Sequence, residues 1–315
     1  MQQTYESQQS WREIQSHLPQ EYRFNRESMP EEDYWNWRGH TVHLDRYRNE
    51  TATHKIIQLH GVGTNGRMMS SIVGRPLADR GYETVAIDLL NYGETHVAAG
   101  HKVSYQDWVD QVVDFIAYER SRDERPIILY GLSAGGMLAY HAAAIDKNVA
   151  GVVGMCFMDM RMKYTKKKVV RWEWMGSKLS FEGLVLYSKL LGKITKVPMT
   201  LLSKMTALVN DKAALKACLA DKTSAGNWVT IDFAMTLMTH KPAMELEDFD
   251  VCPILLTQPA ADTWTPLEIS TPVMERIKKV KKDTVMLDNA GHYPIEHSGL
   301  KQMEHAIVNF IEKLN

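Results

Sequence analysis

Ser133 stands at the centre of the segment Gly131-Leu132-Ser133-Ala134-Gly135, between an apolar run and a helix-like run. Glycines two positions before and after a serine suit a sharp strand-to-helix turn, because larger side chains would clash there. Such a turn exposes the serine at the carboxyl end of its strand. The first amides of the following helix also favour negative charge on a nearby substrate oxygen. The spacing therefore predicts a nucleophilic serine.

A nucleophilic serine needs a base and a carboxylate that orients the base. His292 follows the last predicted strand in a turn-rich loop, and Asp262 follows the strand before it. The chain order serine, aspartate, histidine, with each residue at the carboxyl end of its own strand, is one known arrangement of a catalytic triad.

The predicted elements alternate between strands and helices. Short, nearly continuous apolar runs predict strands that are buried on both faces of a parallel sheet. These runs lie at residues 54–60, 83–90, 126–130, 149–157, 252–258 and 283–288. In residues 34–47 aromatic or branched residues alternate with polar ones around Arg38-Gly39, which predicts an antiparallel hairpin. In residues 105–121 the apolar residues recur at the spacing of a helix. This order predicts an α/β fold.

One region interrupts the alternation. Between Met155 and Pro242 there are 15 Lys and Arg against 6 Asp and Glu, a balance of +9, whereas the rest of the chain has 22 against 32, or −10. We predict a helical cap at residues 157–246, inserted into a core formed by residues 34–156 and 247–315. Residues 1–33 are polar with scattered aromatics and are predicted to form a helical extension.

These residues resemble the α/β-hydrolase family from about Tyr34 to the C-terminus. The segment LHGVGTNG, residues 59–66, is similar to the oxyanion loop of that family. The resemblance implies that the backbone amides of Val62 and Ala134 form the oxyanion hole. It also implies a mostly parallel eight-stranded sheet with helices on both faces. The segment Asn91-Tyr92-Gly93 departs from the family's usual Arg-Gly-x-Gly loop. The resemblance also makes Asp159 a competing acid, because some lipase-like members of the family take the acid from just after the sixth strand, here residues 149–157; Asp262 is preferred.

The resemblance and the three residues together predict a serine hydrolase of the carboxylesterase or lipase type, which cleaves the ester of a small substrate carrying an acyl chain. A lactonase that opens acyl-homoserine-type rings is the first alternative. A carbon–carbon bond hydrolase and a non-catalytic ligand receptor on the same fold are the others. Ten methionines lie between Met155 and Met244, and flexible thioethers suit an adaptable pocket. Phe181, Leu184 and Met238 are predicted to line that pocket.

Several other kinds of function are not indicated. A net charge of −1 gives no general attraction to nucleic acid. The histidine pairs His40/His43, His96/His101 and His292/His297 lack the spacing of a metal site, and no nucleotide-binding glycine motif follows a strand. We therefore expect no metal and no cofactor. Three widely spaced cysteines suggest buried free thiols.

The N-terminal residues lack the pattern of a secretory signal, and no stretch is apolar enough to span a membrane. A cytoplasmic protein without stable membrane insertion is expected. The segment at residues 163–174 is basic with interleaved aromatics. A solvated cap face is the preferred interpretation of this segment, with weak contact to anionic lipid as the alternative.

Overall fold

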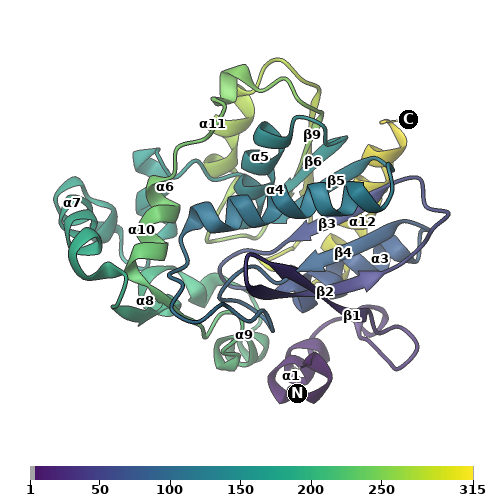
Figure 1. Ribbon diagram of the computed structural model, residues 1–315, viewed down its shortest axis with the longest axis horizontal. Coiled ribbons are helices and arrows are strands. Elements are labelled where there is room, and N and C mark those ends of the chain that lie inside the picture. The colour runs from purple at the N-terminus through teal and green to yellow at the C-terminus, as the bar shows by residue number, and fades with distance from the viewer. Residues whose placement is uncertain (1–3, 315) are drawn as a thin grey trace.

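The computed structural model describes residues 4–314 and contains an eight-stranded sheet (Figure 1). Its strand order is β1-β2-β4-β3-β5-β6-β9-β10; β1 and β2 are antiparallel to each other, β2 is antiparallel to β4, and the remaining pairs are parallel. The strands are β1 (Glu31–Trp37), β2 (His40–Tyr47), β3 (Lys55–Leu59), β4 (Glu83–Ile87), β5 (Ile127–Leu132), β6 (Gly151–Met155), β9 (Ile254–Pro259) and β10 (Lys282–Leu287). The predicted strands are confirmed, with ends shifted by a few residues. The burial predicted for residues 283–288 is wrong, because β10 is an edge strand and most of its residues are exposed.

Helices cover both faces of the sheet. Helix α4 packs on α5 in front of the sheet in Figure 1, and α12 packs with α3 behind it. The core helices are α2 (Gly66–Met69), α3 (Arg75–Ala78), α4 (Tyr105–Arg122), α5 (Ala134–Asp146), α11 (Leu267–Arg276) and α12 (His297–Glu312). The predicted α/β-hydrolase fold is confirmed.

Local sequence explains where these elements turn and begin. Arg38 and Gly39 connect β1 and β2, and both have positive φ, at 48° and 82°. A two-residue hairpin turn requires this conformation, because it matches the twist of the two strands. Helix α4 begins at a capping box. The Ser104 side chain accepts a hydrogen bond from the Asp107 amide, and the Asp107 side chain accepts one from the Ser104 amide.

The inserted region between β6 and β9 is mainly helical and lies to the left in Figure 1. It also contains a short antiparallel ribbon, β7 paired with β8, which the sequence did not predict because each strand has only three residues. The elements of this region are α6 (Lys163–Val169), α7 (Lys178–Tyr187), β7 (Lys196–Pro198), α8 (Met199–Leu202), α9 (Lys212–Ala220), β8 (Trp228–Thr230) and α10 (Ile231–Thr239).

The N-terminal segment runs across the core and the inserted region. Its helix α1 (Gln9–Ser16) packs against α9, and the Ser10 hydroxyl lies 3.4 Å from a carboxylate oxygen of Asp221. Trp11 and Phe24 form a small apolar cluster of their own with Tyr5. The segment ends at β1, which begins at Glu31, three residues before the predicted hairpin. No helix among residues 4–314 is long and apolar enough to cross a membrane.

Candidate active site

Ser133 lies in a strained turn between β5 and α5. Its φ is 58° and its ψ is −121°, which places a non-glycine residue in a region that costs on the order of 1–3 kcal/mol. A Cβ on Gly131 would lie 2.0 Å from the Gly135 carbonyl oxygen, and a Cβ on Gly135 would lie 2.2 Å from that of Leu59. Both glycines are therefore required sterically, as the sequence predicted for this turn.

The loop after β3 lies directly against Ser133. A Cβ on Gly61 would lie 2.8 Å from the Ser133 Cβ. Val62 and Ala134 line the same cavity as Ser133. The amide of Ala134 is the first of helix α5, so it has no acceptor within that helix and is free to bind a ligand oxygen.

The buried histidine His60 fixes this loop. Its Nδ1 is 2.8 Å from the Gly61 carbonyl oxygen, and its Nε2 accepts a hydrogen bond from the Leu89 amide at 3.0 Å. Burial lowers the pKa of His60, so the neutral ring can donate from one nitrogen and accept at the other. His60 thus joins the loop after β3 to the loop after β4.

The loop after β4 contains Asn91-Tyr92-Gly93, the segment that differs from the usual Arg-Gly-x-Gly sequence. This loop folds back on the core. Tyr92 is buried and packs against the rings of His60 and Trp108. Gly93 has a φ of 57°, and a Cβ there would lie 1.9 Å from the Asp88 carboxyl carbon. This loop does not line the cavity at Ser133.

Asp262 and His292 are in direct contact. The Asp262 Oδ2 lies 2.8 Å from the His292 Nδ1, and both side chains are buried. The other carboxylate oxygen accepts hydrogen bonds from the amides of Trp264 and Thr265, and the Thr265 hydroxyl donates to Oδ2 at 2.6 Å. Burial alone would raise the pKa of Asp262, but the charge and hydrogen bonds of His292 and Thr265 lower it. An ionised carboxylate can thus orient the ring.

Asp159, the competing acid, has other partners. It binds Arg161 at 2.9 Å and Arg276 at 3.3 Å. Burial alone would raise the pKa of Asp159, but these two arginines lower it. The structure therefore pairs Asp262, and not Asp159, with the candidate base.

A cavity opens above Ser133 beneath the inserted region. It holds about 910 Å³ of space free of protein atoms, part of it at the open mouth, and its lining is mostly apolar. Five methionines contribute. Four come from the predicted stretch, Met158, Met160, Met199 and Met238, and Met137 on α5 was not predicted. Phe181 and Leu184 are not among the lining residues, so this part of the pocket prediction is not met. Both lie on α7, which has no buried residue.

Two histidines that line the same cavity were not identified from the sequence. His141 and His240 both line it, and their rings lie 4.6 Å apart. Burial lowers the pKa of His141 to about 3, and the neighbouring His240 contributes a smaller part of this shift. The ring of His141 therefore stays neutral. A signal was available, because Met137 and His141 follow Ser133 at intervals of four residues and so share one face of the helix.

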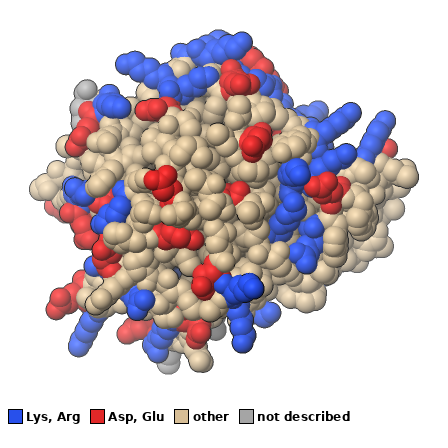
Figure 2. All heavy atoms as spheres, turned by 180° about the vertical axis from the view of Figure 1, so that it is seen from behind, with Lys and Arg blue, Asp and Glu red and all other residues tan. Residues whose placement is uncertain are grey.

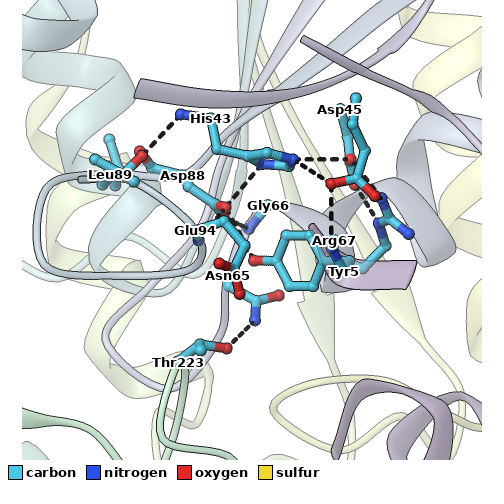
Figure 3. Close-up of polar contacts among 12 residues, drawn as sticks. Tyr5, His43, Asp45, Asn65, Gly66, Arg67, Asp88, Leu89, Glu94 and Thr223 are labelled. Carbon is cyan, nitrogen blue, oxygen red and sulfur yellow. Dashed lines mark hydrogen bonds and ion pairs between the residues drawn. The ribbon is translucent and has the colours of Figure 1, made fainter. Parts of the chain in front are cut away.

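A second buried polar cluster lies under the N-terminal segment (Figure 3). The Tyr5 hydroxyl donates to the Asp88 carboxylate at 2.9 Å, and the His43 Nδ1 lies 2.9 Å from the same group. The other ring nitrogen of His43 lies 2.9 Å from Glu32. Burial alone would lower the pKa of His43, but Asp88 and Glu32 raise it to about 10. His43 is therefore a buried imidazolium held by carboxylates.

The carboxylates of this cluster already have a second cation. Glu32, His43 and Asp45 bring potential metal-ligand atoms within 4.8 Å of one another. Arg67, however, binds Asp45 at 2.6 Å and Glu32 at 3.1 Å. Its guanidinium also lies over the ring of Tyr5, at 4.8 Å from the centroid. We interpret the cluster as a structural ion network that attaches the N-terminal segment.

Raising the pH from about 6.5 to about 10 is expected to lower the free energy of unfolding. Below pH 6.5, the ordinary pKa of histidine, His43 is protonated in both the folded and the unfolded state. Between pH 6.5 and about 10 only the folded state keeps this proton, so each rise in pH favours unfolding. Above about 10 the stabilisation by the His43 imidazolium is lost. The slope from this group reaches at most about 1.4 kcal/mol per pH unit. Urea unfolding over a pH series measures it.

His43→Gln should flatten this slope, whereas His305→Gln, at an exposed position on α12, should leave it unchanged. An equal slope in all three proteins would contradict the assignment of a buried imidazolium.

Comparison with known proteins agrees with this architecture. A family model described as the alpha/beta hydrolase family matches residues 59–303. The quorum-quenching protein AidA of Acinetobacter baumannii (strain MDR-ZJ06) is 26% identical over 213 residues, which are 64% of this chain and 68% of that protein.

Two solved structures share the fold at low sequence identity. A soluble variant of monoglyceride lipase from Saccharomyces cerevisiae has a TM-score of 0.71 at 15% identity, covering 93% of this chain and 98% of that one. The monoacylglycerol lipase of Paleococcus ferrophilus has a TM-score of 0.62 at 19% identity, covering 86% and 99%. With the family match over most of its length and this strand order, the chain belongs to the alpha/beta hydrolase family.

Proposed function

We propose that the protein is a serine hydrolase that cleaves the carboxylic ester of a small substrate carrying an acyl chain. One observation carries the proposal: the strained Ser133 opens into an apolar cavity, and the buried carboxylate of Asp262 lies 2.8 Å from His292 on the loop after the last strand. The proposed roles are nucleophile for Ser133, general base and acid for His292, and orienting carboxylate for Asp262.

The reaction proceeds in two halves. His292 takes the proton of the Ser133 hydroxyl as its oxygen attacks the ester carbonyl, and the amides of Val62 and Ala134 stabilise the oxyanion, each by roughly 3–4 kcal/mol. Asp262 stabilises the imidazolium without taking its proton. His292 then protonates the leaving alcohol. A water molecule, deprotonated by His292, attacks the acyl-enzyme and releases the acid and the free Ser133.

The cavity supports an acyl group as the part of the substrate that is recognised. Its lining is mostly apolar and rich in methionine, and each methylene buried there contributes about 0.8 kcal/mol. Two acylglycerol lipases share the fold at 15% and 19% identity. This likeness concerns the fold alone, so the ester substrate is inferred from the cavity and from the arrangement of Ser133, Asp262 and His292.

A lactone is the second candidate substrate, because the relative AidA is named a quorum-quenching protein. Ring opening of a lactone uses the same attack, but the leaving alcohol stays attached to the acyl group. Assays of purified protein on p-nitrophenyl esters and on acyl-homoserine lactones decide between the two. The proposal would be contradicted if the protein hydrolysed neither esters nor lactones.

The cavity lining is expected to set the preferred acyl length. The specificity constant should rise with each added methylene until the cavity is filled, by up to about fourfold per methylene. Met238→Ala should shift the optimum to longer chains and leave acetate esters unaffected, because Met238 lines the cavity. Phe181→Ala is the matched control, since Phe181 lies outside that lining. A p-nitrophenyl ester series measures both, and an unchanged optimum in Met238→Ala would contradict the assignment.

A further inference from the structure

The outer side of the inserted region exposes many large apolar side chains. Among the residues that the structure describes, 14 large hydrophobic side chains are exposed, and 10 of them lie between residues 163 and 204. Six of these ten are here called the apolar cap face. They are Trp172, Trp174, Leu179, Leu186, Leu190 and Ile194.

Helix α7 and the turn after it present much of this face. None of the α7 side chains is buried. Leu179, Leu186 and Leu190 follow one another at intervals of seven and four residues, which places them on one side of the helix. They are 83%, 61% and 74% exposed. A soluble surface rarely carries so many neighbouring apolar groups unless they contact a partner.

Trp172 and Trp174 extend the face beside α7. Their rings stack at a centroid distance of 6.3 Å with an interplanar angle of 15°, and they are 44% and 63% exposed. Tryptophan is enriched at the level of lipid headgroups, because its ring is apolar and its indole N–H can hydrogen-bond. Exposed tryptophans together with exposed leucines are typical of a helix that lies in a bilayer interface.

The charge around the face is strongly basic. Residues 163–204 contain 10 Lys and Arg but only 2 Asp and Glu. The exposed lysines include Lys167, Lys178, Lys189 and Lys193. Figure 2 shows this lobe at its right as a mostly tan surface bordered by Lys and Arg side chains. Such a surface complements anionic lipid headgroups.

We propose that the apolar cap face is a peripheral docking surface for an anionic lipid bilayer. Apolar side chains would enter the interface while the surrounding lysines bind the headgroups. A second copy of this chain fits less well, because two such faces would bring like charges together.

The docking surface and the cavity belong to the same segment of chain. Val169, Met199 and Leu202 from this segment line the cavity, whereas the apolar cap face points outward. Docking therefore brings the cover of the cavity to the lipid surface. The binding itself does not depend on the proposed ester hydrolysis.

Vesicle flotation of the 315-residue chain tests the proposal. We expect binding to mixed phosphatidylcholine–phosphatidylglycerol vesicles that exceeds binding to pure phosphatidylcholine vesicles by about tenfold or more at low salt, and that weakens as salt screens the lysines. Leu179→Asp/Leu190→Asp should reduce binding to the mixed vesicles by about tenfold or more, because two carboxylates would have to enter the interface.

Ile145→Asp/Leu267→Asp is the matched control, because these two side chains are also exposed but lie on core helices. It should bind as the parent does, and thermal melting should show that all three proteins are folded. Failure of the parent to bind anionic vesicles overturns the proposal, as does equal loss in both variants. The parent could instead self-associate without binding vesicles, and only Leu179→Asp/Leu190→Asp could abolish this self-association. That result would assign the apolar cap face to contact with a second copy and would also overturn the proposal.

Discussion

Ser133→Ala is expected to abolish ester hydrolysis and leave the fold intact. The hydroxyl oxygen is the proposed attacking atom, so its removal lowers turnover by on the order of 10⁶-fold. The backbone should tolerate the change, because alanine removes a single atom from a side chain that is already buried in the turn. Turnover of p-nitrophenyl esters, with circular dichroism and thermal melting as checks on folding, measures the effect.

Ser203→Ala is the matched control for this experiment. Ser203 lines the same cavity, but its hydroxyl donates to the Met199 carbonyl oxygen. Its loss should change turnover by less than about threefold. A fluorophosphonate should label the parent at Ser133 and fail to label Ser133→Ala. Turnover by Ser133→Ala within tenfold of the parent would contradict its role as the nucleophile, and an unlabelled parent without turnover would favour a ligand receptor on this fold.

Asp262→Asn is expected to lower turnover by about 10³- to 10⁴-fold. The amide keeps the shape of the side chain but favours the wrong tautomer of His292, and it no longer stabilises the imidazolium. The structure motivates the test, because the carboxylate lies 2.8 Å from the His292 Nδ1. The loss should fall on kcat, with KM for the ester little changed.

Asp159→Asn is the matched control for the acid. Asp159 lines the cavity as well, yet its carboxylate binds Arg161 and Arg276. Its replacement should lower turnover by less than about tenfold, mainly through a less stable contact with these arginines. A large loss in Asp159→Asn with a small one in Asp262→Asn would move the role of the acid to the residue after β6.

Much of the core was predictable because its signals are local. Strands that are buried on both faces need continuous apolar runs, and β3, β4, β5 and β9 are fully buried as those runs indicated. The turn at Ser133 was predictable because its steric demands admit only small residues at fixed positions. The placement of Asp262 beside His292 agrees with the chain order, while the catalytic roles of all three residues remain predictions.

The inserted region was less predictable because its packing depends on distant contacts. Apolar spacing suggested Phe181 and Leu184 as pocket residues, but periodicity gives only the apolar side of a helix and not what that side faces. In the structure Phe181 and Leu184 are half-buried on α7 and do not reach the cavity, while Leu179 and Leu186 on the other side of the helix are exposed. The attachment of Tyr5 to Asp88 gave no sequence signal either, since the two residues are 83 positions apart.

The N-terminal segment has a consequence for the order of events during synthesis. Ser10 meets Asp221, which lies 211 residues later in the chain. At about 5–20 residues per second, the ribosome needs roughly 10 to 40 s to make that stretch. During this interval α1 lacks its partner α9. Early in the interval Trp11 and Phe24 also lack the Arg67 guanidinium that lies over their rings, because Arg67 belongs to α2. Helix α1 therefore docks on α9 late, and the side chains of Trp11 and Phe24 are available to chaperones in the meantime.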